Sequence, residues 1–156
     1  MTTSGYPFVV KKLRRGQSLA QAEEVYRGQQ DDQLGTYGAV LADGSGNRQV
    51  IVMRRPTFFG GETHVWTPEG TKKLDIPART FPAGMVDGQV LFQTSDPWGA
   101  VAAGSVASAP LAMVESGRVT PTILFAPNPR QSVDEVVTTK DHVVLIYNDN
   151  VRGRAA

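Results

Sequence analysis

A polar turn followed by a buried strand recurs three times in this chain of 156 residues, and this pattern constrains the fold more than any other feature. The last copy is the clearest, because Lys140 and Asp141 form a polar turn, residues 143–147 are an apolar run, and an Asn-Asp-Asn sequence ends it. The earlier strands begin at Val50 and Val90, so the three copies start roughly 40 to 50 residues apart. A period of that length, holding several strands, is typical of the blades of a β-propeller.

Any all-β chain contains some Asp-Gly turns followed by valine-rich runs, so the recurrence alone has a trivial explanation. The segments between the copies argue against it, because they also divide into pairs of short strands around turn residues. We expect six hairpins that alternate between an outer and an inner position, beginning with an outer one. The predicted fold class is all-β, a β-propeller-like segment of about twelve antiparallel strands in three four-stranded blades. The end blade is split between the two termini, and residues 1–156 form a single domain.

Two connections between the expected strands have more than one interpretation. Segment 19–24 is rich in Ala, Gln and Glu and could form a helical turn, although a wide polar turn inside a hairpin is preferred. The connection 110–119 has room for one short helical turn. The expected strand pairs are 6–13 with 22–26, 36–42 with 49–54, 62–67 with 71–76, 81–86 with 89–94, 105–109 with 120–125, and 133–139 with 142–147. The chain then runs off the end from residue 151.

The charge balance excludes some classes of partner. Net charge is +1, from 16 basic and 15 acidic residues, which argues against a dedicated surface for nucleic acid or for an anionic membrane. The basic pairs at 11–12 and 14–15 are offset by nearby acidic residues, so a solvated hairpin edge explains them better than a basic patch. No apolar run is long enough to span a membrane, and the N-terminus lacks the layout of a signal peptide. We expect a soluble protein, and the sequence leaves open whether its compartment is the cytoplasm or the periplasm.

Residue types for metal or thiol chemistry are scarce. The chain has no cysteine, which excludes a disulfide, a thiolate zinc site and a cysteine nucleophile. Two histidines make a zinc site improbable, and the spacing of a calcium-binding EF-hand is absent. Asp31, Asp32 and Asp43 could ligate calcium, but the capping of turns by aspartate is the preferred interpretation. We expect no metal and no cofactor.

Catalytic motifs are also missing. A Gly-x-Ser-x-Gly sequence, which presents a serine nucleophile at a sharp turn, does not occur. His142 follows Asp141, but neighbouring residues of a strand point to opposite faces, so we do not expect them to pair. His64 lies beside Trp66 in an expected strand and is assigned a role on the hairpin surface. No catalytic residue is predicted, and we do not expect this chain alone to be an enzyme.

Large aromatic side chains are the best candidates for contacts with a ligand or a partner. Trp66, Trp98, Phe58 and Phe59 could line a groove for a peptide or a carbohydrate. In propellers such rings mostly pack between blades, and that interpretation is preferred for the set as a whole. Trp98 is the strongest exception, because it follows Asp96 and Pro97 at a strand end and could reach a loop near the central channel.

Three stretches of the chain carry a resemblance to a known family. They are SGYPFVVKKLRRGQSL, RRPTFFGGETHVWTPEGTKKLDIP and APNPRQSVDEVVTTKDHVVLIYNDNVRGR. They resemble the propeller domain of the prolyl oligopeptidase family of serine peptidases, and bacterial members most. The resemblance covers residues 5–154, and its most specific parts are the Pro-Thr-Phe-Phe sequence at 56–59 and the sequence at 149–154.

The resemblance implies a function for the chain as part of a larger enzyme. In that family a propeller, usually of about seven blades, covers an α/β-hydrolase domain and admits only short peptides. The nucleophile and its triad lie on the hydrolase domain, which this chain does not contain. We therefore expect a non-catalytic propeller segment with a structural and substrate-gating role, whose partner is the parent hydrolase domain. The alternative is a free-standing binding module that recognises a peptide, a sugar or a partner protein through aromatic loops.

Assembly is the last expectation. Closed propellers have about four to eight blades, so three blades cannot close a ring. The N-terminal outer hairpin has no inner partner, and the C-terminal inner hairpin has no outer partner. Pairing these hairpins between two chains would give a swapped dimer, whereas pairing within one chain would complete a third blade. We expect a second copy of this chain as a partner and prefer the dimer over the monomer.

Overall fold

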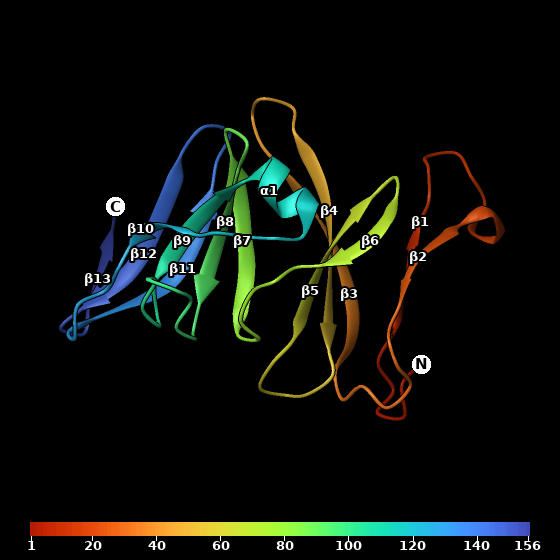
Figure 1. The fold of residues 1–156 in the computed structure, drawn as a ribbon, viewed down its shortest axis with the longest axis horizontal. Helices are drawn as coiled ribbons and strands as arrows, with labels where there is room; N and C mark the ends of the chain where they lie inside the picture. Colours follow the sequence, from red (N-terminus) through yellow and green to blue (C-terminus); the bar gives the residue numbers. More distant parts are fainter.

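The chain folds into four antiparallel β-sheets that stand side by side, as a computed structural model of residues 1–156 shows (Figure 1). Two complete four-stranded sheets occupy the middle of the row. A two-stranded hairpin lies at the N-terminal end, and a three-stranded sheet lies at the C-terminal end. The predicted all-β, propeller-like fold is confirmed.

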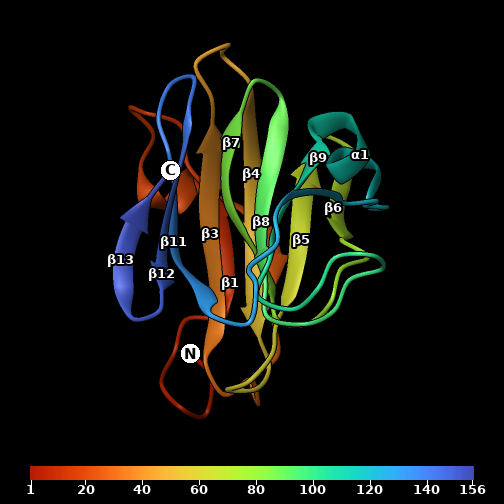
Figure 2. The ribbon, with the colours of Figure 1, turned by 90° about the vertical axis from the view of Figure 1, so that its left-hand side faces the viewer.

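The two complete sheets each run through four strands in chain order. The first sheet contains β3 (Gly35–Ala42), β4 (Arg48–Arg55), β5 (Glu62–Thr67) and β6 (Gly70–Lys73). The second sheet contains β7 (Thr80–Val86), β8 (Gln89–Thr94), β9 (Val106–Pro110) and β10 (Thr122–Phe125). The short helical turn expected between β9 and β10 is present as α1 (Leu111–Ser116). Figure 2 shows α1 beside β9 and β6, where it bridges the two complete sheets.

The two incomplete sheets lie at opposite ends of the row (Figure 1). The N-terminal hairpin pairs β1 (Val9–Lys12) with β2 (Glu23–Arg27), and the wide turn between them contains a short 3-10 helix, η1 (Leu19–Gln21). The C-terminal sheet contains β11 (Gln131–Thr138), β12 (Val143–Asp149) and β13 (Arg152–Ala155). The two halves of the expected end blade are thus not paired with each other within the chain. β13 is an additional strand, since the sequence was expected to run off as a loop.

Both faces of the central strands are buried, which explains why their sequences are continuous apolar runs rather than alternating ones. Along β8, Val90 and Phe92 face the core between the two complete sheets, where Ile51 and Val65 of the first sheet meet them. Leu91, which lies between Val90 and Phe92 in the sequence, faces the opposite side of the sheet, in a smaller core against the C-terminal sheet. The period of two along a strand therefore distributes one apolar run between two cores.

The turns of the three inner hairpins are hydrogen-bonded to one another around Asp43. One carboxylate oxygen of Asp43 accepts from the backbone of its own turn at Ser45 and Asn47, at 3.0 and 2.9 Å. The other oxygen accepts from the backbone N–H of Gly88, in the turn of the second sheet, at 2.8 Å. The N–H of Gly44 donates to the carbonyl of Lys140, in the turn of the C-terminal sheet, at 2.9 Å. Asp43 thus caps turns, as preferred from the sequence.

No helix in the structure is both long and apolar enough to cross a membrane.

The core between the two complete sheets should dominate stability. We predict that Phe92→Ala lowers the free energy of unfolding by about 3–5 kcal/mol, because Phe92 is fully buried and its loss leaves a cavity. Urea unfolding of the wild type and the variant measures the change. The matched control is Phe59→Ala, which removes an exposed ring and should change stability by less than about 0.5 kcal/mol. Equal effects of the two variants would contradict the assignment of the core.

Candidate functional site

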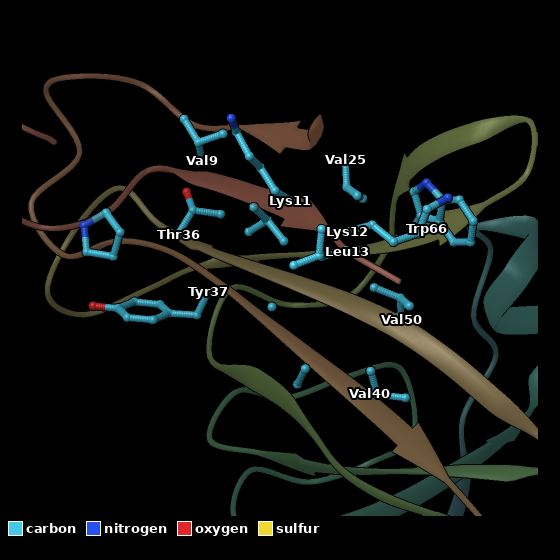
Figure 3. A pocket seen from close by; sticks show the side chains of 14 residues that line it. Val9, Lys11, Lys12, Leu13, Val25, Thr36, Tyr37, Val40, Val50 and Trp66 are labelled. Carbon is cyan, nitrogen blue, oxygen red and sulfur yellow. The ribbon is translucent and has the colours of Figure 1, made fainter. Parts of the chain in front are cut away.

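The largest concave feature of the surface is a groove of about 590 Å³ between the N-terminal hairpin and the first complete sheet. Figure 3 shows its lining, in which side chains of β1 face side chains of β3, β4 and β5. Nine of its 14 lining residues are hydrophobic, so the groove is mainly apolar. Its floor is a row of three residues that are neighbours across strands, Val40, Val50 and Trp66.

The groove exists because the hairpin covers one face of the first sheet incompletely. On the opposite face of this sheet, Ile51 and Val65 are fully buried against the second sheet. On the groove face, Val52 is also fully buried, yet Val40 in the same sheet is 60% exposed. β1 pairs with β2 along one edge and has no strand along its other edge. An apolar floor and a free strand edge therefore lie next to each other.

The charged groups of the groove are two lysines of β1, Lys11 and Lys12. Lys12 places its Nζ atom 4.3 Å from the centre of the Trp66 ring, a cation–π contact, and 3.1 Å from a carboxylate oxygen of Glu23. Lys11 is exposed, and no acidic residue lines the groove. The groove thus combines an apolar floor with positive charge at its rim.

A buried ion pair holds the chain that leaves β2 against the first sheet. Arg54 of β4 binds Asp32 through both carboxylate oxygens, and the two shortest hydrogen bonds are Nη2 to Oδ1 at 2.7 Å and Nε to Oδ2 at 2.9 Å. The side chain of Asp32 is only 1% exposed, and its carboxylate also accepts from the N–H of Gln29. The hydrogen bonds from Arg54 lower the pKa of Asp32 against the opposing effect of burial, and the same bonds raise the pKa of Arg54. Both groups are charged in the folded protein.

His64 lies next to this pair and connects the hairpin to β5. Its Nε2 atom is 3.1 Å from the hydroxyl of Tyr26, on β2, and 3.4 Å from a carboxylate oxygen of Glu62. Burial lowers the pKa of His64, and the hydrogen bond with Glu62 offsets part of that effect. Glu62 also binds Lys73 at 2.8 Å, and the hydrogen bond from Lys73 is the main reason that the pKa of Glu62 is lowered. Burial raises the pKa of Tyr26.

These charged and polar residues clamp the N-terminal hairpin onto the first sheet. A tyrosine, a histidine and a glutamate in series can relay a proton when the two neighbours bind different nitrogens of the imidazole ring. Here Tyr26 and Glu62 both lie near the same nitrogen, Nε2 of His64, and the histidine lies under the hairpin. The sequence-based assignment of His64 to the hairpin surface was wrong, since the residue is buried, and sequence reasoning did not single out this cluster. A signal was present, because Glu62 and His64 are two residues apart on one strand and so share one face, and Arg54 is the cross-strand neighbour of Glu62.

Two of the predicted aromatic candidates lie together on an exposed loop. Phe58 and Phe59 follow β4 and are 65% and 83% exposed, with their ring centres 6.0 Å apart. The backbone around them is fixed, because Gln33 accepts from the N–H of Phe58 and Arg55 donates to its carbonyl. A fixed loop that displays two aromatic rings has the character of a contact surface.

The other two aromatic candidates are placed elsewhere. Trp66 lies in the floor of the groove, near the end of β5 that is farther from the loop carrying Phe58 and Phe59. Trp98 is 8% exposed and packs edge-on against Phe92, at 5.5 Å between ring centres, inside the main core. Trp98 was singled out from the sequence as the exception that could reach a loop near the central channel, and its ring instead lies in the core, as expected for the aromatic set as a whole. The structure therefore does not gather the four aromatic residues into one site.

The expectation that Asp141 and His142 point apart was wrong. The Nδ1 atom of His142 is 2.7 Å from a carboxylate oxygen of Asp141, because both residues lie in the turn before β12 rather than in a strand. Both side chains are exposed at the end of the hairpin. No three His, Asp or Glu residues lie close enough together to hold a metal ion.

The fold and the groove define an all-β, propeller-like segment whose end sheet is incompletely covered. No family model matches the chain. In sequence it is 33% identical to the uncharacterized peptidase y4nA of Sinorhizobium fredii over 166 residues, which covers 97% of this chain and 22% of that peptidase. In structure it is similar to a post-proline cleaving enzyme from Rickettsia typhi, with a TM-score of 0.84 and 20% identity. That match covers 99% of this chain and 24% of the enzyme.

The predicted resemblance to the prolyl oligopeptidase family is therefore confirmed, as a resemblance to a segment. The chain spans less than a quarter of the length of each of these two relatives. Its relative in sequence is a peptidase, and its fold is that of a segment of a post-proline cleaving enzyme.

The clamp around His64 should make stability depend on pH. Because the pKa of His64 is lowered in the folded protein, the unfolded chain binds a proton more readily, so we predict that stability falls as pH drops below 6.5, the usual value for histidine. The pKa values of the Asp32 and Glu62 carboxyl groups are also lowered in the folded protein, so protonation of these groups further lowers stability. This further loss of stability occurs only at a lower pH, where carboxylates take up protons. Urea unfolding between about pH 7.5 and pH 5 measures the slope.

His64→Gln should flatten this slope above the range in which carboxylates titrate. The matched control is His142→Gln, in an exposed turn, which should leave the slope as it is. The clamp would not be the origin of the pH dependence if both variants kept the wild-type slope.

Proposed function

We propose that this chain is a non-catalytic β-propeller segment of a prolyl-oligopeptidase-like serine peptidase of the bacterial type. In the parent enzyme it helps to build the wall that restricts access to the active site and packs against the hydrolase domain. The observation that carries this proposal is the 33% identity to a peptidase over 97% of the chain, joined to the likeness in fold to a segment of a post-proline cleaving enzyme.

The structure supports a structural role in two ways. The sheets stack face to face and bury apolar residues between them, as expected for one part of a larger ring. The phenylalanine loop, residues 56–61, displays two rings on a fixed backbone, which suits a contact with a neighbouring domain. The chain has no Gly-x-Ser-x-Gly sequence, so the proposal assigns the chemistry to another part of the enzyme.

The absence of activity in this chain alone is directly testable. We predict that the purified protein does not release the chromophore from a short chromogenic prolyl peptide above the rate in buffer. Turnover that persists through repeated purification, and that follows the protein peak, would overturn the proposal.

A chimera tests the gating role. The chain would replace the matching segment of the Rickettsia typhi post-proline cleaving enzyme, and cleavage of a short prolyl peptide would be compared with cleavage of an unfolded protein. We predict that the chimera cleaves the peptide and excludes the protein. The matched variant carries Phe58→Ser and Phe59→Ser, and tests whether the loop supports docking of the hydrolase domain. A folded chimera that cleaves both substrates alike would contradict a gating role.

A free-standing binding module is the second candidate function. The specific observation in its favour is the apolar groove with a cationic rim, whose volume lies in the range of small-molecule and peptide sites. The genomic sequence next to the coding region separates the two candidates. An in-frame hydrolase domain supports the peptidase segment, and a stop codon followed by a terminator supports the module.

A further inference from the structure

We propose that the groove is the seat of the inner hairpin, β11–β12, of a second copy of this chain, which adds β12 to the free edge of β1. In each complete sheet the third strand pairs with the second strand of an inner hairpin, as β5 pairs with β4 and β9 with β8. β1 pairs with β2 as a third strand does with a fourth, yet no strand occupies its other edge. Within residues 1–156, the sheet that begins with the N-terminal hairpin therefore contains only two of the four strands that a complete sheet has. This inference concerns the chain of residues 1–156 by itself, because in a larger propeller other strands of the parent enzyme would cover the two ends of the row.

The far face of the C-terminal sheet has the composition to fill the groove. Val136 and Leu145 face the second complete sheet and are buried or packed against its core. Because side chains alternate along a strand, the cross-strand pair Val137 and Val144 faces outward, together with Ile146. These apolar side chains are half-buried or exposed at the free end of the row. They match an equally apolar floor at the other end of the molecule.

Charge is complementary between the two surfaces. The only charged residues that line the groove are Lys11 and Lys12. On the far face of the C-terminal sheet, Glu135 is the cross-strand neighbour of Ile146 and is exposed. Docking of this face would place a carboxylate on the same surface that meets the cationic rim. The two surfaces lie at opposite ends of one chain, so two copies that each place their C-terminal sheet on the other's groove form a ring of two if the curvature of the row closes it.

β13 occupies the edge of β12 to which β1 of the second copy would pair. Two features of β13 favour its release from this edge. All four residues of β13 are exposed, so the strand contributes little buried area. The turn that leads into it places Asn150 and Val151 at φ values of 49° and 66°. A β-branched residue at positive φ is strained, and Val151 is 97% exposed, so no packing compensates for the strain. The competing pairing of β12 with β1 of a second copy carries no such turn.

Light scattering in line with size exclusion tests the proposal on the full chain. We predict a dimer that dissociates on dilution. Val40→Lys in the groove floor and Val144→Lys on the far face should each raise the dimer dissociation constant by about tenfold or more, because each buries an unpaired charge. The matched control is Ile123→Lys, an exposed substitution on β10, which lies in neither surface and should leave the constant unchanged.

Val151→Gly tests the role of β13 with the opposite sign. Glycine accepts positive φ without strain, so this variant should stabilise β13 on β12 and weaken the dimer, although the residue lies outside the expected contact. A chain that stays monomeric at high concentration would overturn the proposal, as would a dimer that Val40→Lys and Ile123→Lys affect equally.

Cross-linking identifies the contact independently of stability, because the wild-type chain has no cysteine. One preparation carries Val40→Cys and the other Val144→Cys, and they are mixed and oxidised. We expect the mixed disulfide dimer to form faster than the dimer of either variant alone. Equal rates in the mixture and in the separate preparations would show that some other surface, or some other occupant of the groove, is involved.

Discussion

The architecture of this protein follows from one constraint, which is that its sheets are apolar on both faces. A sheet with one polar, solvent-exposed face can lie at the surface of a protein, but a sheet with two apolar faces needs a neighbour on each side. The residues of β8 show this directly, since Phe92 and Leu91 enter two different cores. Sheets of this kind form rows that either close into a ring or terminate on a covered face. At the N-terminal end of this row the cover is a single hairpin, and the groove is the part of the face that two strands cannot cover.

Polar and charged contacts, rather than apolar contacts alone, hold the hairpin at that end against the first sheet. Tyr26 of the hairpin binds His64 of the first sheet, and Asp32, in the segment that leaves β2, forms an ion pair with Arg54. Charged contacts with fixed geometry specify one position, whereas apolar contacts allow neighbouring positions at similar free energy. A small hairpin with little area to bury therefore gains its orientation from hydrogen bonds. Because hydrogen bonds hold the hairpin in place, the three apolar residues of the groove floor, Val40, Val50 and Trp66, remain free for another contact.

The sequence was sufficient to predict the order of the hairpins, because turn residues and apolar runs are local signals. The turn at Asp43 and the strand beginning at Gln89 were predicted close to their observed positions. β13 was not predicted, because its pairing depends on a turn through Val151 that sequence preferences disfavour. The clamp around His64 was also missed, since it joins residues of β2, β4 and β5 that are far apart in the chain. Trp98 shows the same limit, because a position next to a proline at a strand end does not reveal whether the ring turns inward.

The hydrogen bonds around Asp43 have a consequence for how the molecule comes apart. Rows of similar units can lose their end units one at a time, because each unit contacts only its neighbours. Here the turn of the first sheet is bonded both to Gly88 in the second sheet and to Lys140 in the C-terminal sheet. The first and third inner hairpins are thus in direct contact, past the unit that separates them in the row. Opening of the turn of the C-terminal sheet breaks a bond to the first sheet, which couples the three inner hairpins more closely than contacts between neighbouring sheets alone would.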